Sequence, residues 1–358
     1  MLASFTSGPT KKRSQVVAVD LGARTTKAVQ IIRKGQGFEL VNFACTDTPT
    51  ADKGLSAEAL AEHLKHVLQA VSARSKHITL VIGLGETILR HAELPLIPIA
   101  DARLMLKFNS KNYLQQDFPD HTFDLHLLPL VNQNAPTPGE GAKPIAPTKG
   151  RYLVSGAKNS ILQHYQHAAK LAGITLDMLI PSAITPANAF EMAMPDVFQK
   201  EVVALVDLGH DNSSISILKN GELILFRVVA IGSKKITSGL AESMGVTVAE
   251  AEGIKVGLPD EVQVAMQSLL MPLGRELRAS IDFIEHQQDK SVSQVYMSGG
   301  SARSQFIVET LQSELMVQSQ TWNPTGFMTL SLPPQQMAEL EQSAPSLTIA
   351  VGGAMAAF

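Results

Sequence analysis

The stretch VVAVDLGARTTKAVQI, residues 16–31, begins as an apolar run typical of a buried strand and then meets an acid, Asp20, shortly before Gly22. An acid is rarely buried without a partner, so its place at the end of such a run needs a reason. For a single copy, the ordinary explanation is an Asx-type turn in which the aspartate caps its own backbone.

The same pattern returns near the middle of the chain as VALVDLGHDNSSISIL, residues 203–218. A shift of 187 positions takes Asp20 to Asp207, and it also places Thr26 on Ser213. We interpret the two stretches as copies of one unit, made of a strand, a tight glycine turn rich in hydroxyls and a returning strand. The duplication favours a shared function over turn chemistry alone.

Such a turn suggests anion binding, because glycine lets backbone N–H groups approach an oxyanion closely. A neighbouring aspartate would repel phosphate unless a cation lies between them. Hydrated Mg²⁺ is such a cation, since it takes one or two carboxylates together with phosphate oxygens. Two hairpins facing each other across a cleft would therefore hold a polyphosphate and its magnesium from both sides.

A third glycine turn, SGGSAR at residues 298–303, follows another apolar strand and leads into a helix. The N-terminus of a helix favours phosphate or the edge of a nucleotide. This motif is weak by itself, but three glycine turns at strand ends favour a nucleotide site.

Composition excludes several classes of protein. The 358 residues suffice for two lobes, and a net charge of −3 gives no basic field for nucleic acid. The single cysteine, Cys45, excludes an internal disulfide framework. No apolar run approaches the ~20 residues that cross a bilayer, and the leader lacks the apolar core of a signal peptide, so we expect a cytoplasmic protein.

Strands and helices are intermixed along the whole chain, which predicts an α/β fold. Ser56 is expected to cap a helix, Asn220 and Gly221 to form a hairpin turn, and a long helix to run from about 260 to 288. His63 with His66, and His164 with His167, lack a third ligand, so both pairs are interpreted as solvated helix faces. Further expected features are the strands QVVAVDL, TKAVQII, FELVNFA, HITLVIG, RYLVSGA, 201–208 and QVYMS, a helix from Asn159 to Gly173, a capping box at Thr247 and Glu250, and a loop over 132–150.

The order of the motifs DLG, DLG, AEGIK and SGGSAR resembles the actin-like ATPase superfamily, and within it the PilM family of type IV pilus assembly. The likeness runs from Gln15 to Phe358 and includes LPLIP, IGSKKITSGLAESMGVTVAEAEGIKVGL, ELRASIDFIEHQ and AVGGAMAAF. It implies an actin-like (ribonuclease H-like, duplicated) fold with two lobes and a nucleotide cleft. The expected division is a flexible leader at 1–14, lobe 1 at 15–200 (core 15–90 and 176–200, inserted subdomain 91–175) and lobe 2 at 201–358 (core 201–235 and 292–358, inserted subdomain 236–291).

The resemblance also implies ATP and Mg²⁺ as ligands, with Asp20 and Asp207 holding the metal through water. Glu252 and Lys255 match a pair that flanks the nucleoside; apart from the resemblance, their i, i+3 spacing on one helix face favours a surface ion pair. His210 is interpreted either as a phosphate contact or as an ordinary turn histidine. The nucleotide-binding residues expected from the likeness are Asp20, Gly22, Ala23, Arg24, Thr25, Lys27, Asp207, Gly209, His210, Glu252, Lys255, Gly299, Gly300 and Ser301.

Two departures from the superfamily pattern concern hydrolysis. Ala23 and Arg24 occupy positions where many relatives carry hydroxyls, and Arg24 is expected to pair with a phosphate instead. Ile180 stands where related ATPases often carry the acid that orients the attacking water. No catalytic residue is assigned, and hydrolysis is expected to be slow or absent.

The expected role is an ATP-binding scaffold of a pilus or related secretion machine. The resemblance implies a partner, the cytoplasmic N-terminal peptide of a PilN-like inner-membrane protein, bound between the inserted subdomain and lobe 1. Other pilus assembly proteins and further copies of the chain are also expected partners, whereas nucleic acid and direct membrane insertion are not. The protein would be peripheral to the inner membrane through its partner. Two alternatives stay open, a sugar-type kinase of the same superfamily and an FtsA-like cell-division filament protein.

Overall fold

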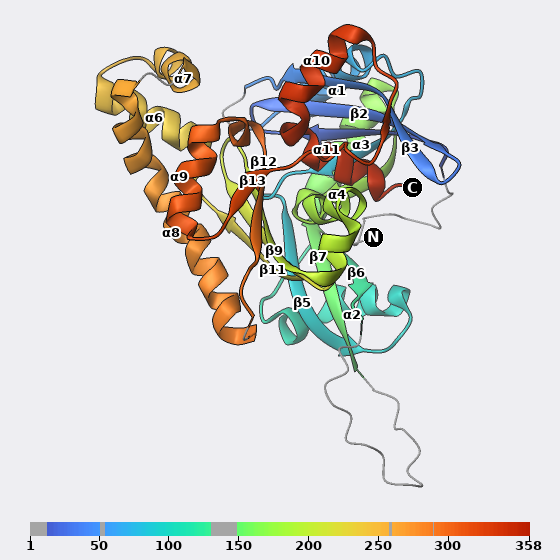
Figure 1. Ribbon diagram of the computed structural model, residues 1–358. Coiled ribbons are helices and arrows are strands. Elements are labelled where there is room, and N and C mark those ends of the chain that lie inside the picture. The colour runs from blue at the N-terminus through green and yellow to red at the C-terminus, as the bar shows by residue number, and fades with distance from the viewer. Residues whose placement is uncertain (1–12, 51–53, 130–148, 258–259, 289) are drawn as a thin grey trace.

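The structure, a computed structural model, describes residues 13–50, 54–129, 149–257, 260–288 and 290–358. Two expected segments lie almost wholly outside the described residues. Only residues 13–14 of the expected leader and 149–150 of the expected loop over 132–150 are described. The described part contains three sheets with helices packed around them (Figure 1).

The first sheet has the strand order β14-β3-β2-β1-β4-β8. Strands β1, β2 and β3 form an antiparallel meander, and β4 and β8 continue it in parallel with β1. The strand bounds are β1 (Gln15–Leu21), β2 (Thr25–Lys34), β3 (Gly37–Asp47), β4 (His77–Ile82), β8 (Thr175–Pro181) and β14 (Thr329–Leu330).

Helices cover both faces of this sheet, which explains why β1 is apolar without alternation. Val17 and Val19 pack against α1 and α3, whereas Val16 and Ala18 pack against α4 and α11 on the other face. The helices of this part are α1 (Ala57–Ala70), α3 (Asn159–Ala172), α4 (Thr185–Ala193), α5 (Pro195–Lys200), α10 (Pro334–Ser343) and α11 (Thr348–Met355).

Helix α1 begins as expected, because the Ser56 side chain accepts a hydrogen bond from the backbone N–H of Ala59. The interpretation of His63 and His66 as one solvated face is wrong for His63. His66 is exposed, but His63 is only 5% exposed, because α1 turns that side chain toward β2 and the buried Thr26. His167 is exposed and His164 half-buried.

The second sheet has the order β11-β10-β9-β12-β13. Its strands are β9 (Val202–Leu208), β10 (Ser213–Lys219), β11 (Glu222–Val229), β12 (Gln294–Ser298) and β13 (Ser319–Thr321). The β10–β11 turn carries positive φ at both Asn220 and Gly221, as the sequence predicted.

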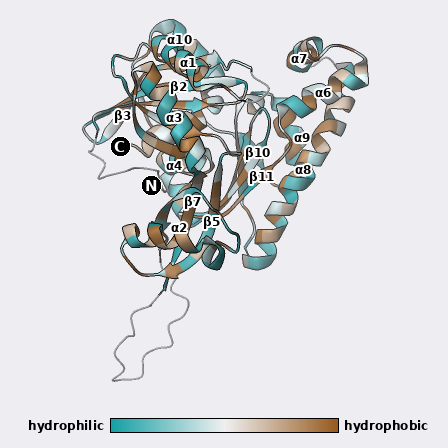
Figure 2. Cartoon of the chain, turned by 180° about the vertical axis from the view of Figure 1, so that it is seen from behind, coloured by the Kyte–Doolittle hydropathy of each residue, from teal (hydrophilic) through white to brown (hydrophobic). Residues whose placement is uncertain are grey.

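One face of the second sheet is covered by α6 (Ser233–Met244), α8 (Asp260–Gln288) and α9 (Gln305–Leu315), and α7 (Val248–Gly257) follows α6. The long helix α8 confirms the prediction over 260–288, and Figure 2 shows hydrophilic and hydrophobic colour alternating along it. Its buried hydrophobic residues recur every three or four positions, as a helix with one packed face requires: Val262, Met266, Leu270, Leu273, Leu277, Ile281 and Ile284.

The opposite face of the second sheet joins the core of the first, since Val203 and Leu205 belong to the same apolar cluster as Val16 and Ala18. Phe190 of α4 lies at this junction, with its ring centroid 4.8 Å from that of Tyr296 and 5.2 Å from that of Trp322. One continuous core therefore connects the two sheets.

A third, antiparallel sheet has the order β5-β7-β6, with α2 (Ile99–Leu114) packed on it. Its strands are β5 (Thr87–Pro95), β6 (His121–Leu127) and β7 (Lys149–Lys158). Leu89 and Leu153 of this sheet belong to the same apolar cluster as Leu223 of the second sheet. The domain boundaries given above stay predictions. The structure adds that α3 packs on the first sheet rather than the third, and that α11 near the end of the chain also packs on the first.

Candidate functional site

The first hairpin places Asp20 at the end of β1, directly opposite Lys27 of β2 in the strand register. The Lys27 ammonium lies 3.4 Å from the Asp20 carboxylate. A Cβ at Gly22 would lie 2.4 Å from the carbonyl oxygen of Thr25, so the turn through Ala23 and Arg24 can form only with glycine there.

The second hairpin repeats this geometry. A Cβ at Gly209 would lie 2.4 Å from the carbonyl oxygen of Asn212, the residue that the 187-position shift pairs with Thr25. The bounds of β9 follow from those of β1 by the same shift, at both ends of the strand. The sequence repeat is therefore also a repeat of strand bounds and of the backbone approach at each glycine.

The two aspartates differ in their partners. Ser298 of β12 lies beside Asp207 in the register and donates a 2.9 Å hydrogen bond to its carboxylate. Burial raises the pKa of Asp20 although Lys27 opposes the shift. Burial also raises the pKa of Asp207, against Ser298 and Lys27, and the negative charge of Asp20 raises it further. Two carboxylates that share one lysine and repel each other form a site suited to an additional cation.

The third turn lies against the second hairpin. Gly299 has φ +92°, and a Cβ there would meet the Leu208 carbonyl oxygen at 2.4 Å. Its backbone N–H donates to the carbonyl of Pro345 at 2.9 Å, whereas Gly300 faces open space. The last residues of β9 and β12 are thereby held side by side.

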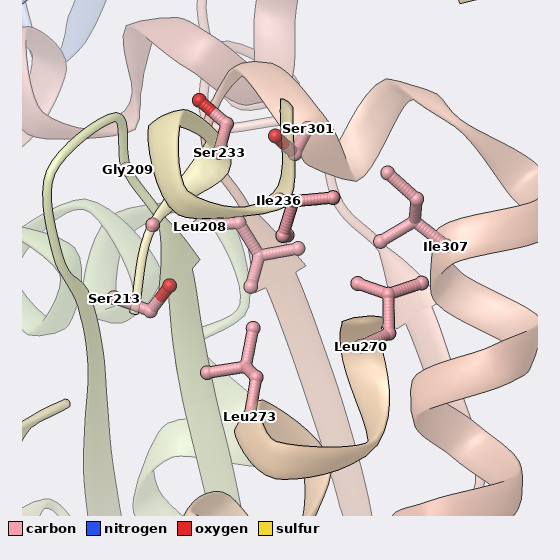
Figure 3. Close-up of a pocket in the computed structure, with 10 residues that line it drawn as sticks. Leu208, Gly209, Ser213, Ser233, Ile236, Leu270, Leu273, Ser301 and Ile307 are labelled. Atoms are coloured by element: carbon pink, nitrogen blue, oxygen red, sulfur yellow. The ribbon is translucent and has the colours of Figure 1, made fainter. Parts of the chain in front are cut away.

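A small pocket opens beside the second hairpin and the third turn, and no residue of the first hairpin lines it (Figure 3). Ser233 and Ser301 lie at one end of the pocket, and Leu270 and Leu273 lie at the other. The structure thus brings together Gly209 and Ser301, which the sequence analysis named separately. The full lining is Leu208, Gly209, Ser213, Gly232, Ser233, Ile236, Leu270, Leu273, Ser301 and Ile307.

Sequence reasoning missed Gly232 and Ser233, which lead into α6. The sequence signal for Gly232 is its position directly before a helical pattern. The first backbone N–H groups of a helix have no partner within the helix, so they are available to a ligand. A Cβ there would lie 2.2 Å from the carbonyl oxygen of His210, so this loop closes directly over the second hairpin. The His210 ring lies 3.1 Å from the Ser233 hydroxyl, and burial lowers the pKa of that histidine.

Glu252 and Lys255 form an ion pair at 2.6 Å on α7, but they do not line the pocket. Glu252 also binds Arg24 of the first hairpin, with 2.7 Å between the guanidinium and the carboxylate. Thr237 of α6 completes the group, donating to Glu252 at 2.8 Å and accepting from Lys255 at 2.9 Å. This network joins the first hairpin to α6 and α7 across a separation of 228 residues.

Glu252 gives a pH dependence that can be measured. Burial alone would raise the pKa of its carboxyl, but hydrogen bonds from Lys255, Thr237 and Arg24 outweigh burial and lower the pKa to about 2. A carboxyl with a lowered pKa stabilises the fold above its unfolded pKa, 4.5, and loses that contribution as the pH falls toward 2. We expect Glu252→Gln to have a lower urea midpoint than the parent at neutral pH, with the two midpoints converging over that range. A difference that stays constant with pH would contradict this account of the network.

Comparison with known proteins agrees with this architecture. The chain is similar to a solved PilM–PilN type IV pilus biogenesis complex, with a TM-score of 0.80 and 20% identity over 98% of this chain and 99% of the other. It is also similar to the ethanolamine utilization protein EutJ from Carboxydothermus hydrogenoformans, with a TM-score of 0.54 and 14% identity over 97% of this chain and 91% of EutJ. These likenesses confirm the predicted actin-like fold.

Among curated proteins, the cell division protein FtsA of Bacillus subtilis is 28% identical over 103 residues, which cover 29% of this chain and 22% of FtsA. The match therefore spans about a fifth of that relative's length. A family model described as type IV pilus assembly protein PilM matches residues 139–358, which is more than half of the chain. The protein belongs to the PilM family of type IV pilus assembly proteins.

Proposed function

We propose that the chain is an actin-like scaffold of a type IV pilus machine that binds ATP with Mg²⁺ between its two aspartate hairpins. One observation carries the proposal: the same glycine turn follows two buried strands. At both Gly22 and Gly209, a Cβ would lie 2.4 Å from the carbonyl oxygen three residues later. Family membership connects this site to pilus assembly.

The residues present fit a magnesium nucleotide. In the described part of the chain, no group of three or more histidine, cysteine, aspartate or glutamate side chains gathers to hold a metal. Asp20 and Asp207 supply two carboxylates, which suit an ion that takes one or two carboxylates and keeps most of its waters, as Mg²⁺ does. These two residues would hold the ion through water, and when bound it would neutralise phosphate charge. Lys27 and Arg24 add positive charge at the first hairpin. In the second hairpin, the residue equivalent to Lys27 is Ser214, which is neutral.

We propose slow or absent hydrolysis. Ile180 near the end of β8 is fully buried and has no group that could accept a proton from water. Arg24 and Lys27 can orient phosphates, and neither is a base at neutral pH. The chain's own residues therefore bind and orient the nucleotide without activating a nucleophile.

We propose that the partner is the cytoplasmic N-terminal peptide of a PilN-like inner-membrane protein, which would make the chain peripheral to the inner membrane. Support comes from the likeness to the PilM–PilN complex over nearly the whole chain. Among the described residues, no helix has the length and apolar character needed to cross a bilayer. The third sheet with α2, inserted between the strands of the first, is the proposed inserted subdomain beside which the peptide binds.

The partner proposal is tested with a fluorescent peptide carrying the cytoplasmic N-terminal sequence of the PilN-like protein from the same organism. We expect saturable binding measured by anisotropy, and competition by the unlabelled peptide, because a specific groove recognises side chains as well as backbone. A scrambled peptide of equal composition is the control. Equal binding of the two peptides would contradict the proposal, and ATP-dependent phosphorylation of a sugar would favour the kinase alternative.

A further inference from the structure

A chain of side-chain hydrogen bonds runs from helix α1 to the bend of the first hairpin. Thr48 donates from its hydroxyl to the carbonyl oxygen of Gly22 at 2.7 Å. The hydroxyls of Thr48 and Thr26 are 2.9 Å apart, and the Thr26 hydroxyl lies 2.7 Å from Nε2 of His63. Thr26 is fully buried and His63 is 5% exposed, so the chain is shielded from water over its inner half.

The direction of each hydrogen bond follows from proton counting, because a hydroxyl has one proton to donate. Thr48 gives its proton to Gly22, so it must accept from Thr26. Thr26 then has no proton left, so it must accept from His63. The His63 ring therefore carries a proton on Nε2, and every bond of the chain points toward the glycine.

The last hydrogen bond of this chain matters for anion binding because its acceptor, the Gly22 carbonyl, belongs to the same peptide group as the N–H of Ala23. A peptide group is planar and trans, so fixing the Gly22 carbonyl toward Thr48 also turns the Ala23 N–H to the opposite side. Thr48 holds the bend a second time, since its backbone N–H donates to the carbonyl of Arg24 at 2.9 Å.

The second hairpin is held differently, although its fold is the same. The carbonyl of Gly209 accepts from the backbone N–H of Ser233 at 2.9 Å, where the first hairpin uses a side-chain hydroxyl. Ser213, the repeat of Thr26, donates to the carbonyl of Ile231 at 2.7 Å. The glycine carbonyl of the second bend is therefore held by backbone, whereas the glycine carbonyl of the first bend is held by a line of side chains that ends at His63.

We propose that His63 is a positioning residue that acts through Thr26 and Thr48 to orient the Gly22–Ala23 peptide for the phosphates of the magnesium nucleotide. The proposal rests on the proposed nucleotide site and adds a residue of α1 to its machinery. Burial and the neighbouring His66 lower the pKa of His63, which agrees with a neutral ring.

The test combines variants of His63 with two readouts. His63→Leu removes the donor and keeps the bulk, His63→Gln restores an N–H donor, and His66→Leu is the control on the exposed face of the same helix. By calorimetry with Mg²⁺, we expect His63→Leu to weaken ATP binding on the order of tenfold, and His63→Gln and His66→Leu to stay within about threefold of the parent. Long-range ¹H–¹⁵N spectra of the unliganded parent should show His63 protonated on Nε2.

The outcomes separate this inference from the proposed function. A His63 ring protonated only on Nδ1, or ATP binding by folded His63→Leu equal to that of the parent, would overturn the positioning role. If His63→Leu does not fold, Thr48→Val compared with Thr48→Ser supplies the same test at the outer end of the chain. A parent that binds no ATP would defeat the proposed function, while the protonation of His63 would still decide the hydrogen-bond chain.

Discussion

Asp207→Asn should lower the affinity for ATP in the presence of Mg²⁺ on the order of 100-fold while leaving the unliganded protein folded. The asparagine oxygen can still accept from Ser298, which donates to the Asp207 carboxylate at 2.9 Å. Burial raises the pKa of Asp207, so the ionised form is disfavoured in the folded protein without a cation. Removing that charge should therefore preserve or increase the stability of the unliganded protein, while the metal loses one of its two carboxylates.

Calorimetry of ATP binding with Mg²⁺ and with EDTA, together with urea unfolding, measures both parts of this prediction. Asp211→Asn is a matched control four residues away, because Asp211 is exposed and lies 4.0 Å from Lys234. It should change ATP affinity by about twofold at most. If the Asp207→Asn variant binds ATP as tightly as the parent does, the second hairpin is not part of the nucleotide site.

Gly352→Ala should strongly destabilise the protein, because a Cβ at Gly352 makes the shortest contact of any glycine in the described part of the chain. Helix α11 crosses α4 so closely that a Cβ at Gly352 would lie 1.8 Å from the carbonyl oxygen of Thr185. That oxygen belongs to the backbone of a fully buried residue, so relief requires the two helices to separate. We expect a loss of about 3 kcal/mol or more. Nucleotide binding should weaken as well, because α11 packs under β1.

Gly253→Ala provides the matched control for Gly352→Ala. Gly253 also lies in a helix, α7, but a Cβ there would meet nothing within 4 Å. Alanine at this position should leave stability unchanged or raise it by about 1 kcal/mol at most. Urea unfolding of the two variants against the parent measures the difference. Equal midpoints for Gly352→Ala and the parent would show that the packing of α11 on α4 is looser than the structure indicates.

Much of the fold could be predicted because local patterns and global packing agree. The apolar runs of β1 and β9, the Asn220–Gly221 turn and the stripe along α8 each carry a periodicity or turn chemistry that a single sequence displays. Strands β5 and β6 escaped prediction. Charged and polar side chains interrupt their apolar residues, and only their antiparallel pairing with β7 defines them.

The parts of the site that the sequence did not predict are those made by distant residues. The ion pair of Arg24 with Glu252 and the contact of Thr26 with His63 depend on how helices pack against hairpins, which no local pattern encodes. The sequence favours a solvated His63 because no third ligand accompanies His63 and His66, and the pattern does not show that α1 turns His63 toward Thr26. The repeat of the aspartate turns was predictable for the opposite reason, since both copies are contiguous in sequence.

The proposed site holds one divalent cation between two aspartates that belong to different sheets. Its most direct test is a crystal structure of the protein with ATP in which Mn²⁺ replaces Mg²⁺, so that anomalous scattering locates the ion. We expect a single anomalous peak between Asp20 and Asp207, in water-mediated contact with both, with the triphosphate across the two glycine turns. A structure in which ATP is bound and its Mn²⁺ lies away from Asp20 or from Asp207 would contradict the proposed site.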